Sequence, residues 1–131
     1  MNFANWAAVG GGAAVGAWLR WGMSALLNPL FPTLPPGTLA ANLSAGFMMG
    51  IAMELITRNI AMPTELRLLM TTGFLGGLST FSTFSGEIVN LLSAREYLWS
   101  ALTVAAHVFG SVLLTLLGIY AVRLMFPVHG V

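Results

Sequence analysis

The segment GFLGGLSTFSTFS, residues 73–85, decides how this chain folds. Three glycines fall within its first five positions, and five serine or threonine residues follow within seven positions. Both groups of residues are poor formers of continuous helix. The segment also lies in an uncharged stretch, residues 68–86, that is about as long as one membrane crossing. We therefore predict a membrane-spanning helix that is broken near residues 76–80.

The composition of the chain is that of an integral membrane protein. Hydrophobic residues make up 57% of its 131 residues and charged residues only 7%, against roughly 25% charged residues in soluble domains. The five basic residues are scattered and form no stripe that would follow a phosphate backbone, so we expect no nucleic-acid partner. The absence of cysteine excludes disulfides, thiolate metal sites and cysteine nucleophiles. We expect a multi-pass protein in contact with membrane lipid.

Charged residues and prolines divide the chain into four predicted spans. A helix needs roughly 20 apolar residues to cross about 30 Å of hydrocarbon. The uncharged stretch 21–53 is too long for one crossing, and the prolines between residues 29 and 36 place a loop within it. The predicted spans, in one transmembrane domain covering residues 1–131, are 4–27, 37–57, 66–94 and 97–125. The predicted fold class is an all-α membrane protein with four transmembrane helices per subunit.

A homodimer is the expected working unit, because four helices enclose too little protein for a water-lined pathway and its supporting shell. Small residues spaced four apart let helices approach closely in a membrane, and we expect about two of the three such pairs to pack within the chain. The pairs are Gly12 and Gly16, Gly46 and Gly50, and Gly73 and Gly77. The arginines are nearly balanced between the two sides, so copies of opposite orientation fit the positive-inside rule.

Polar side chains within the spans are few, and each has two interpretations. Arg20 either extends to the membrane interface between two tryptophans or places positive charge at a pore mouth. Asn42 either joins two helices or donates its amide hydrogens to an anion. His107 fits a hydrogen-bonded packing residue better than a proton carrier. The residues by themselves leave these alternatives open.

Phe81 and Phe84 lie on one face of the helix that follows the break. A phenyl ring has a positive edge, so two such edges attract a small anion while neighbouring hydroxyls replace its hydration. The plain alternative is that both rings only pack. The break also frees backbone carbonyls, which suit a hard cation such as Na⁺, although a structural or proton-coupled role fits the same residues.

Four motifs follow one another along the chain: GGAAVGAWLRW at 11–21, PGTLAAN at 36–42, TTGFLGGLSTFSTFS at 71–85, and His107 followed by Gly-Ser at 110–111. In this order they resemble the CrcB/Fluc family of fluoride channels, and the resemblance covers essentially the whole chain. The run GGLSTFSTFS is its most specific part.

This resemblance implies a dual-topology, antiparallel homodimer with two fluoride pores in the cell inner membrane, which exports fluoride passively and lowers its toxicity. It also implies a structural Na⁺ at the dimer interface, bound by the backbone carbonyls of Gly76 and Ser79, and no organic cofactor. The fluoride-pathway residues that it implies are Phe81, Phe84, Asn42, Ser82, Thr83, Arg20, Glu87, Ser111 and Thr115.

Two other functions compete with the channel. A small multidrug-resistance-type, proton-coupled exporter needs a carboxylate in the first span, and residues 1–27 contain no acidic residue. A structural or assembly subunit would use the polar third span for partner contacts alone. The sequence contains no G-x-x-x-x-G-K motif and no catalytic constellation, so we expect neither an ATP-driven pump nor an enzyme.

Overall fold

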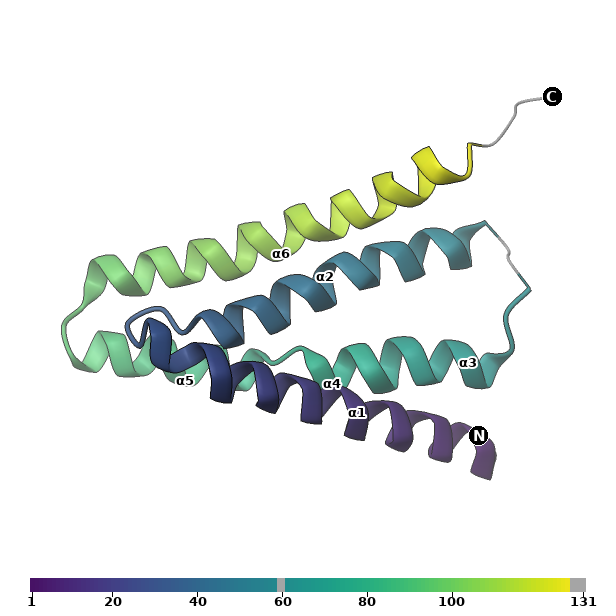
Figure 1. Ribbon diagram of the computed structural model, residues 1–131, viewed down its shortest axis with the longest axis horizontal. Helices are drawn as coiled ribbons and strands as arrows, with labels where there is room; N and C mark the ends of the chain where they lie inside the picture. Colours follow the sequence, from purple (N-terminus) through teal and green to yellow (C-terminus); the bar gives the residue numbers. More distant parts are fainter. Residues whose placement is uncertain (59–60, 128–131) are drawn as a thin grey trace.

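The computed structural model describes residues 1–58 and 61–127, and these form a bundle of helices (Figure 1). The helices are α1 (Phe3–Leu27), α2 (Pro36–Thr57), α3 (Thr64–Leu68), α4 (Gly76–Leu78), α5 (Phe81–Ser93) and α6 (Tyr97–Met125). A 3₁₀ turn, Asn28–Leu30, follows α1, and a π-helical segment, Leu69–Leu75, joins α3 to α4. The segments from α3 to α5 form one interrupted rod that runs beside α1.

The first two helices begin and end where local chemistry dictates. Asn2 caps α1, since its side-chain oxygen accepts from the backbone N–H of Asn5 at 2.9 Å. The helix stops before the prolines, and α2 begins with Pro36 in its first turn, where a missing N–H costs nothing. The next two N–H groups of α2, those of Gly37 and Thr38, donate to the side-chain oxygen of Asn28 at 2.8 and 3.2 Å. Asn28 therefore links the end of α1 to the start of α2.

Glycine permits the close crossing of α1 with the interrupted rod. A Cβ atom on Gly16 would lie 2.7 Å from the backbone nitrogen of Leu78, and one on Gly73 would lie 2.7 Å from the carbonyl oxygen of Val9. Gly12 and Gly77 meet backbone of the opposite segment in the same way. No side chain larger than hydrogen fits these positions at this separation of the helices.

A second close crossing joins α2 to α6. A Cβ atom on Gly46 would lie 2.9 Å from the carbonyl oxygen of Ser111, and one on Gly118 would lie 3.0 Å from the backbone nitrogen of Ile51. Gly50 meets the backbone of Thr115. All three small-residue pairs thus pack within the chain, whereas the sequence favours about two of them. Spacing indicates that a helix can be approached closely but does not say by which neighbour.

The bundle has small residues inside and large apolar residues outside. Ala41, Ala45 and Leu78 form the buried core, while Trp18 and Phe109 are 68% and 74% exposed. An apolar exterior of this kind is covered by lipid or by another apolar surface. It is the arrangement of a membrane protein.

Two of the four predicted spans meet a membrane criterion by length and composition: α2 and α6 are long and apolar enough to cross. α1 has the length, but with its glycines, tryptophans and Arg20 it does not meet the same criterion. The interrupted rod, from α3 to α5, consists of short helices.

An ion cluster ties the ends of α2 and α6 together. The buried carboxylate of Glu54 accepts from Arg58 at 2.9 Å and from Arg123 at 3.1 Å, and Arg58 also donates to the carbonyl of Phe126. The N-terminus lies at this end of the bundle (Figure 1). The proline loop and the turn before α6 lie at the opposite end (Figure 1).

Candidate functional site

The break in the interrupted rod lies at Ser79 and Thr80, between α4 and α5. Both residues are extended, with φ and ψ of −79° and 154° at Ser79 and −150° and 116° at Thr80. The side-chain oxygen of Thr80 accepts from the N–H of Thr83 at 3.2 Å and so caps α5. Serine and threonine favour such local bonds over continuous helix. The break therefore arises from residues within the glycine- and hydroxyl-rich segment 73–85.

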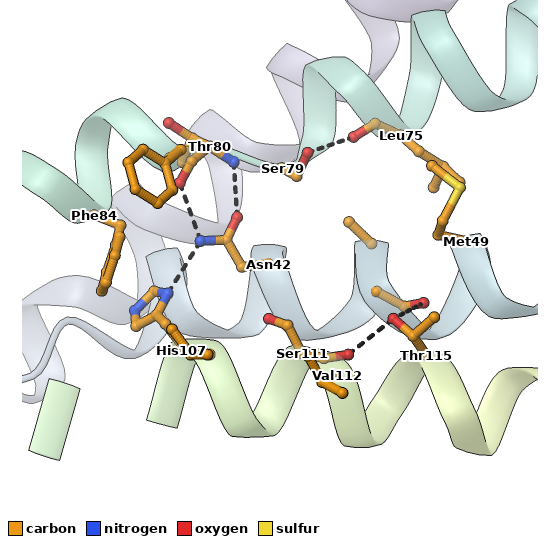
Figure 2. A pocket seen from close by; sticks show the side chains of 14 residues that line it. Asn42, Met49, Leu75, Ser79, Thr80, Phe84, His107, Ser111, Val112 and Thr115 are labelled. Atoms are coloured by element: carbon orange, nitrogen blue, oxygen red, sulfur yellow. Dashed lines mark hydrogen bonds between the residues drawn. The ribbon is translucent and has the colours of Figure 1, made fainter. Parts of the chain in front are cut away.

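Asn42 of α2 pairs with the backbone of the break. The N–H of Thr80 donates to Oδ1 of Asn42 at 2.7 Å, and Nδ2 of Asn42 donates to the carbonyl of Thr80 at 3.1 Å (Figure 2). Nδ2 also lies 3.1 Å from Nδ1 of His107 on α6. Because an amide nitrogen carries two hydrogens, both are engaged with protein acceptors. In this arrangement Asn42 joins helices, which is one of its two interpretations.

The bond to Asn42 sets the tautomer of His107. Since Nδ2 of Asn42 is the donor, Nδ1 of His107 accepts, and the ring proton is assigned to Nε2 from the hydrogen-bond network. His107 is 4% exposed, and its Nε2 has no hydrogen-bond partner among the residues that the structure describes. Its ring centroid lies 4.6 Å from that of Phe84. His107 thus packs and hydrogen-bonds, as the sequence favours.

An open groove of about 430 Å³ lies between α2, the break, α5 and α6 (Figure 2). Its surface is mostly apolar, with hydroxyl groups from the break and from α6. The residues that line it are Asn42, Ala45, Gly46, Met49, Leu75, Ser79, Thr80, Phe81, Phe84, His107, Val108, Ser111, Val112 and Thr115. The groove therefore brings together residues from the second, third and fourth of the four sequence motifs.

Phe81 and Phe84 of α5 both line this groove. Their centroids lie 5.5 Å apart with 63° between the ring planes, which is an edge-to-face pair. Phe84 is 7% exposed, whereas Phe81 is 78% exposed. One ring is therefore fixed in the protomer, and the other stands at its surface.

The remaining sequence-predicted residues divide into two groups. Ser111 and Thr115 line the groove, while Ser82 and Thr83 lie beside it and contact the Thr80 hydroxyl at 3.3 and 3.1 Å. The other group, Arg20 and Glu87, does not line the groove.

Arg20 and Glu87 bind other parts of the bundle. Nε of Arg20 donates to the carbonyl of Gly77 at 3.0 Å, so the guanidinium satisfies a carbonyl that the break leaves without a helical partner. Glu87 accepts from the Thr38 hydroxyl at 2.6 Å. Both side chains therefore connect helices in the protomer.

The residues present fit a hard cation through backbone oxygens. The described part of the chain has no cluster of three or more His, Cys, Asp or Glu side chains. Around the break, three carbonyls accept from protein donors: those of Leu75, Gly77 and Thr80. Those of Gly76 and Ser79 accept no hydrogen bond from the described residues, and both residues are exposed. Such oxygens are suitable ligands for Na⁺.

Known proteins are similar in sequence to this chain over most of its length. The chain matches the family model "CrcB-like protein, Camphor Resistance (CrcB)" over residues 7–119. A protein of Nitrosospira multiformis named "Fluoride-specific ion channel FluC" is 54% identical over 88% of this chain and 91% of its own. The chain belongs to the CrcB family. Proteins of the same name from Ralstonia pickettii and Aromatoleum aromaticum are 50% and 54% identical, over 94% and 89% of this chain and 98% and 89% of their own.

Membership in the CrcB family confirms the family resemblance, and with it that the chain belongs to a family of membrane channels and not of enzymes. Three residues of the hydrogen-bonded network are absent from the site residues predicted from sequence: His107, Thr38 and Asn28. A signal existed for His107, because it stands four and eight residues before Ser111 and Thr115 on an otherwise apolar helix. Thr38 lies at the start of α2, and Asn28 lies in the 3₁₀ turn after α1. Polar residues are common in both places.

Proposed function

We propose that this CrcB-family chain is a fluoride-specific ion channel that lets fluoride leave the cytoplasm passively. The observation that carries the proposal is its 54% identity, over 88% of the chain, to a protein with that name. The groove supports it, because aromatic edges and hydroxyl groups from separate helices meet there.

The physical problem is to replace the water around a small, strongly hydrated anion without binding it too tightly to release it. Ring edges attract an anion through their positive electrostatic potential, but they form only weak bonds. Phe81 and Phe84 supply two rings whose centroids lie 5.5 Å apart. The Ser111 hydroxyl supplies a hydrogen-bonding group along the same groove, whereas the Thr115 hydroxyl donates to the carbonyls of Gly46 and Ser111 at 3.0 and 2.9 Å. Together they form a partial substitute for a hydration shell.

The working channel that we propose is an antiparallel homodimer with dual topology and two pores. In one protomer the groove is open and Phe81 is 78% exposed, so a second copy is needed to enclose the path. The nearly balanced arginines permit insertion in both orientations. Partner copies also bring the exposed carbonyls of Gly76 and Ser79 within reach of one another.

Those carbonyls are the proposed ligands of a structural Na⁺ at the dimer interface. When bound, the ion supplies positive charge that offsets the carbonyl dipoles of two facing helix breaks. Arg20 and Asn42 each occupy a neighbouring carbonyl, of Gly77 and Thr80 respectively, and leave these two available.

Passive transport suffices to remove fluoride from a cell. In an acidic environment fluoride enters as neutral HF and dissociates in the cytoplasm. A negative-inside potential then favours exit of the anion by about 2.3 kcal/mol per 100 mV. We accordingly place the protein in the cell inner membrane, where it lowers fluoride toxicity.

The test is ion efflux from liposomes containing the purified chain. After a potassium ionophore removes the counter-potential, we expect rapid efflux of fluoride and little efflux of chloride. Empty liposomes serve as the control. A well-inserted, dimeric preparation that releases no fluoride would exclude the channel, and equal release of chloride would exclude its selectivity.

A further inference from the structure

A second hydrogen-bonded connection lies one helical turn from Asn42 on α2. Thr38 is fully buried, and its hydroxyl donates to Oε1 of Glu87 on α5 at 2.6 Å. Because Thr38 and Asn42 stand four residues apart, they share a face of α2. Asn42 holds the start of the α5 region at Thr80, and Thr38 holds α5 at Glu87. Phe84 lies between these two attachment points.

The loop residue Asn28 controls the direction of the Thr38 hydroxyl. Its Oδ1 accepts from the N–H groups of Gly37 and Thr38 at 2.8 and 3.2 Å. These two bonds fix the orientation of the amide, so that Nδ2 is turned to the Thr38 hydroxyl oxygen at 3.4 Å. An amide nitrogen only donates, so the single hydroxyl hydrogen of Thr38 has Glu87 as its acceptor.

The local backbone is built for this contact. A Cβ atom on Gly37 would lie 2.7 Å from Oδ1 of Asn28 and 2.7 Å from Cα of Ser24, so only glycine lets the side-chain oxygen of Asn28 and the end of α1 come this close to the start of α2. The second carboxyl oxygen of Glu87 is buried and has no partner among the described residues. The Thr38 hydroxyl is thus the one protein donor that the structure gives to this carboxyl group, within residues 1–58 and 61–127.

We propose that Asn28 is a positioning residue of the fluoride pathway. By fixing the direction of the Thr38 hydroxyl, it holds Glu87 and so sets the position of α5 and its phenylalanine pair against α2. α5 packs chiefly on α6, so side-chain bonds are what connect it to α2. The inference rests on the proposed fluoride transport, since its effect is measured as fluoride efflux.

The decisive variant is Asn28→Asp, which separates capping from positioning. Aspartate caps a helix as well as asparagine does, so the bonds from Gly37 and Thr38 are retained and the start of α2 stays capped. The carboxylate, however, cannot donate to Thr38 and competes with Glu87 for its hydroxyl hydrogen. We expect fluoride efflux about tenfold slower, the change that corresponds to losing one hydrogen bond to a charged group. Asn2→Asp, the same change at the exposed cap of α1, should leave efflux at the wild-type rate.

A double-mutant cycle with Thr38→Val distinguishes positioning from a direct effect of the new charge. If Asn28 acts through the Thr38 hydroxyl, Asn28→Asp has no further effect on efflux in the Thr38→Val background. Independent, multiplicative losses would overturn the inference, as would wild-type efflux in Asn28→Asp alone. Absence of fluoride efflux from the wild-type liposomes would instead overturn the proposed function, so the two failures are distinguishable.

Discussion

Asn42 and Thr80, 38 residues apart, exchange two hydrogen bonds: the Thr80 N–H donates to the side-chain oxygen of Asn42, and the side-chain nitrogen donates to the Thr80 carbonyl. The amide side chain thus takes the place of the helical partners that Thr80 lacks. An interrupted helix in an apolar environment needs such partners, because each unpaired backbone group costs several kcal/mol there. The structure supplies them from a neighbouring helix.

Asn42→Asp should destabilise this junction. The carboxylate keeps an acceptor for the Thr80 N–H but loses the donor to the Thr80 carbonyl and to His107. Each part-buried acceptor left unpaired costs about 1–3 kcal/mol. We expect a lower melting temperature in detergent and slower fluoride efflux. Asn90→Asp makes the same change at an exposed position of α5 and should alter neither quantity. Wild-type stability in Asn42→Asp would show that the junction does not depend on this pair.

The two phenylalanines should differ in their effect on stability but not in their effect on transport. Phe81→Ile and Phe84→Ile each remove a ring edge from the groove, so each should suppress fluoride efflux while dimers still form. Only Phe84 is buried, and reshaping a packed core costs about 1–3 kcal/mol, so only Phe84→Ile should lower the melting temperature. Phe3→Ile, at an exposed site, is the control. Undiminished efflux in both groove variants would reduce the rings to packing residues.

Local helix propensity is sufficient to locate the break in the interrupted rod. Glycines and hydroxyl residues near positions 76–80 disfavour helix, and the structure has extended residues at 79 and 80. Prolines between residues 29 and 36 likewise marked the loop between the first two long helices. These features depend on residues close together in sequence, which is why a single sequence reveals them.

The partners of the polar residues depend on three-dimensional packing and could not be derived in the same way. A buried arginine or asparagine indicates that some partner exists, but not that Arg20 bonds the Gly77 carbonyl or that Asn42 bonds Thr80. Glu87 shows the same limit, because its partner Thr38 lies 49 residues away. Periodicity alone gives the face of a helix and leaves the neighbour unspecified.

The proposed Na⁺ site makes a prediction about Ser79. Its side chain donates to the Leu75 carbonyl at 2.9 Å, and only its backbone carbonyl is a proposed ligand. Replacing Na⁺ with N-methyl-D-glucamine throughout should therefore lower fluoride efflux from wild-type liposomes. Ser79→Ala should show the same dependence on Na⁺ concentration as wild type, because it keeps the carbonyl. Efflux that is independent of Na⁺ in both proteins would exclude a functional cation, and loss of the dependence in Ser79→Ala alone would assign the ligand to the hydroxyl.

Glycine at the crossing of α2 and α6 gives a prediction whose sign opposes helix propensity. Gly→Ala inside a helix normally stabilises it by about 1 kcal/mol, but a Cβ atom on Gly50 would lie 2.9 Å from the carbonyl carbon of Thr115. Separating two packed helices costs about 1–3 kcal/mol, so Gly50→Ala should lower the melting temperature of the chain in detergent. Gly10→Ala, which meets nothing within 4 Å, should leave it unchanged or raise it. A rise in both variants would mean that the two helices separate freely at this crossing.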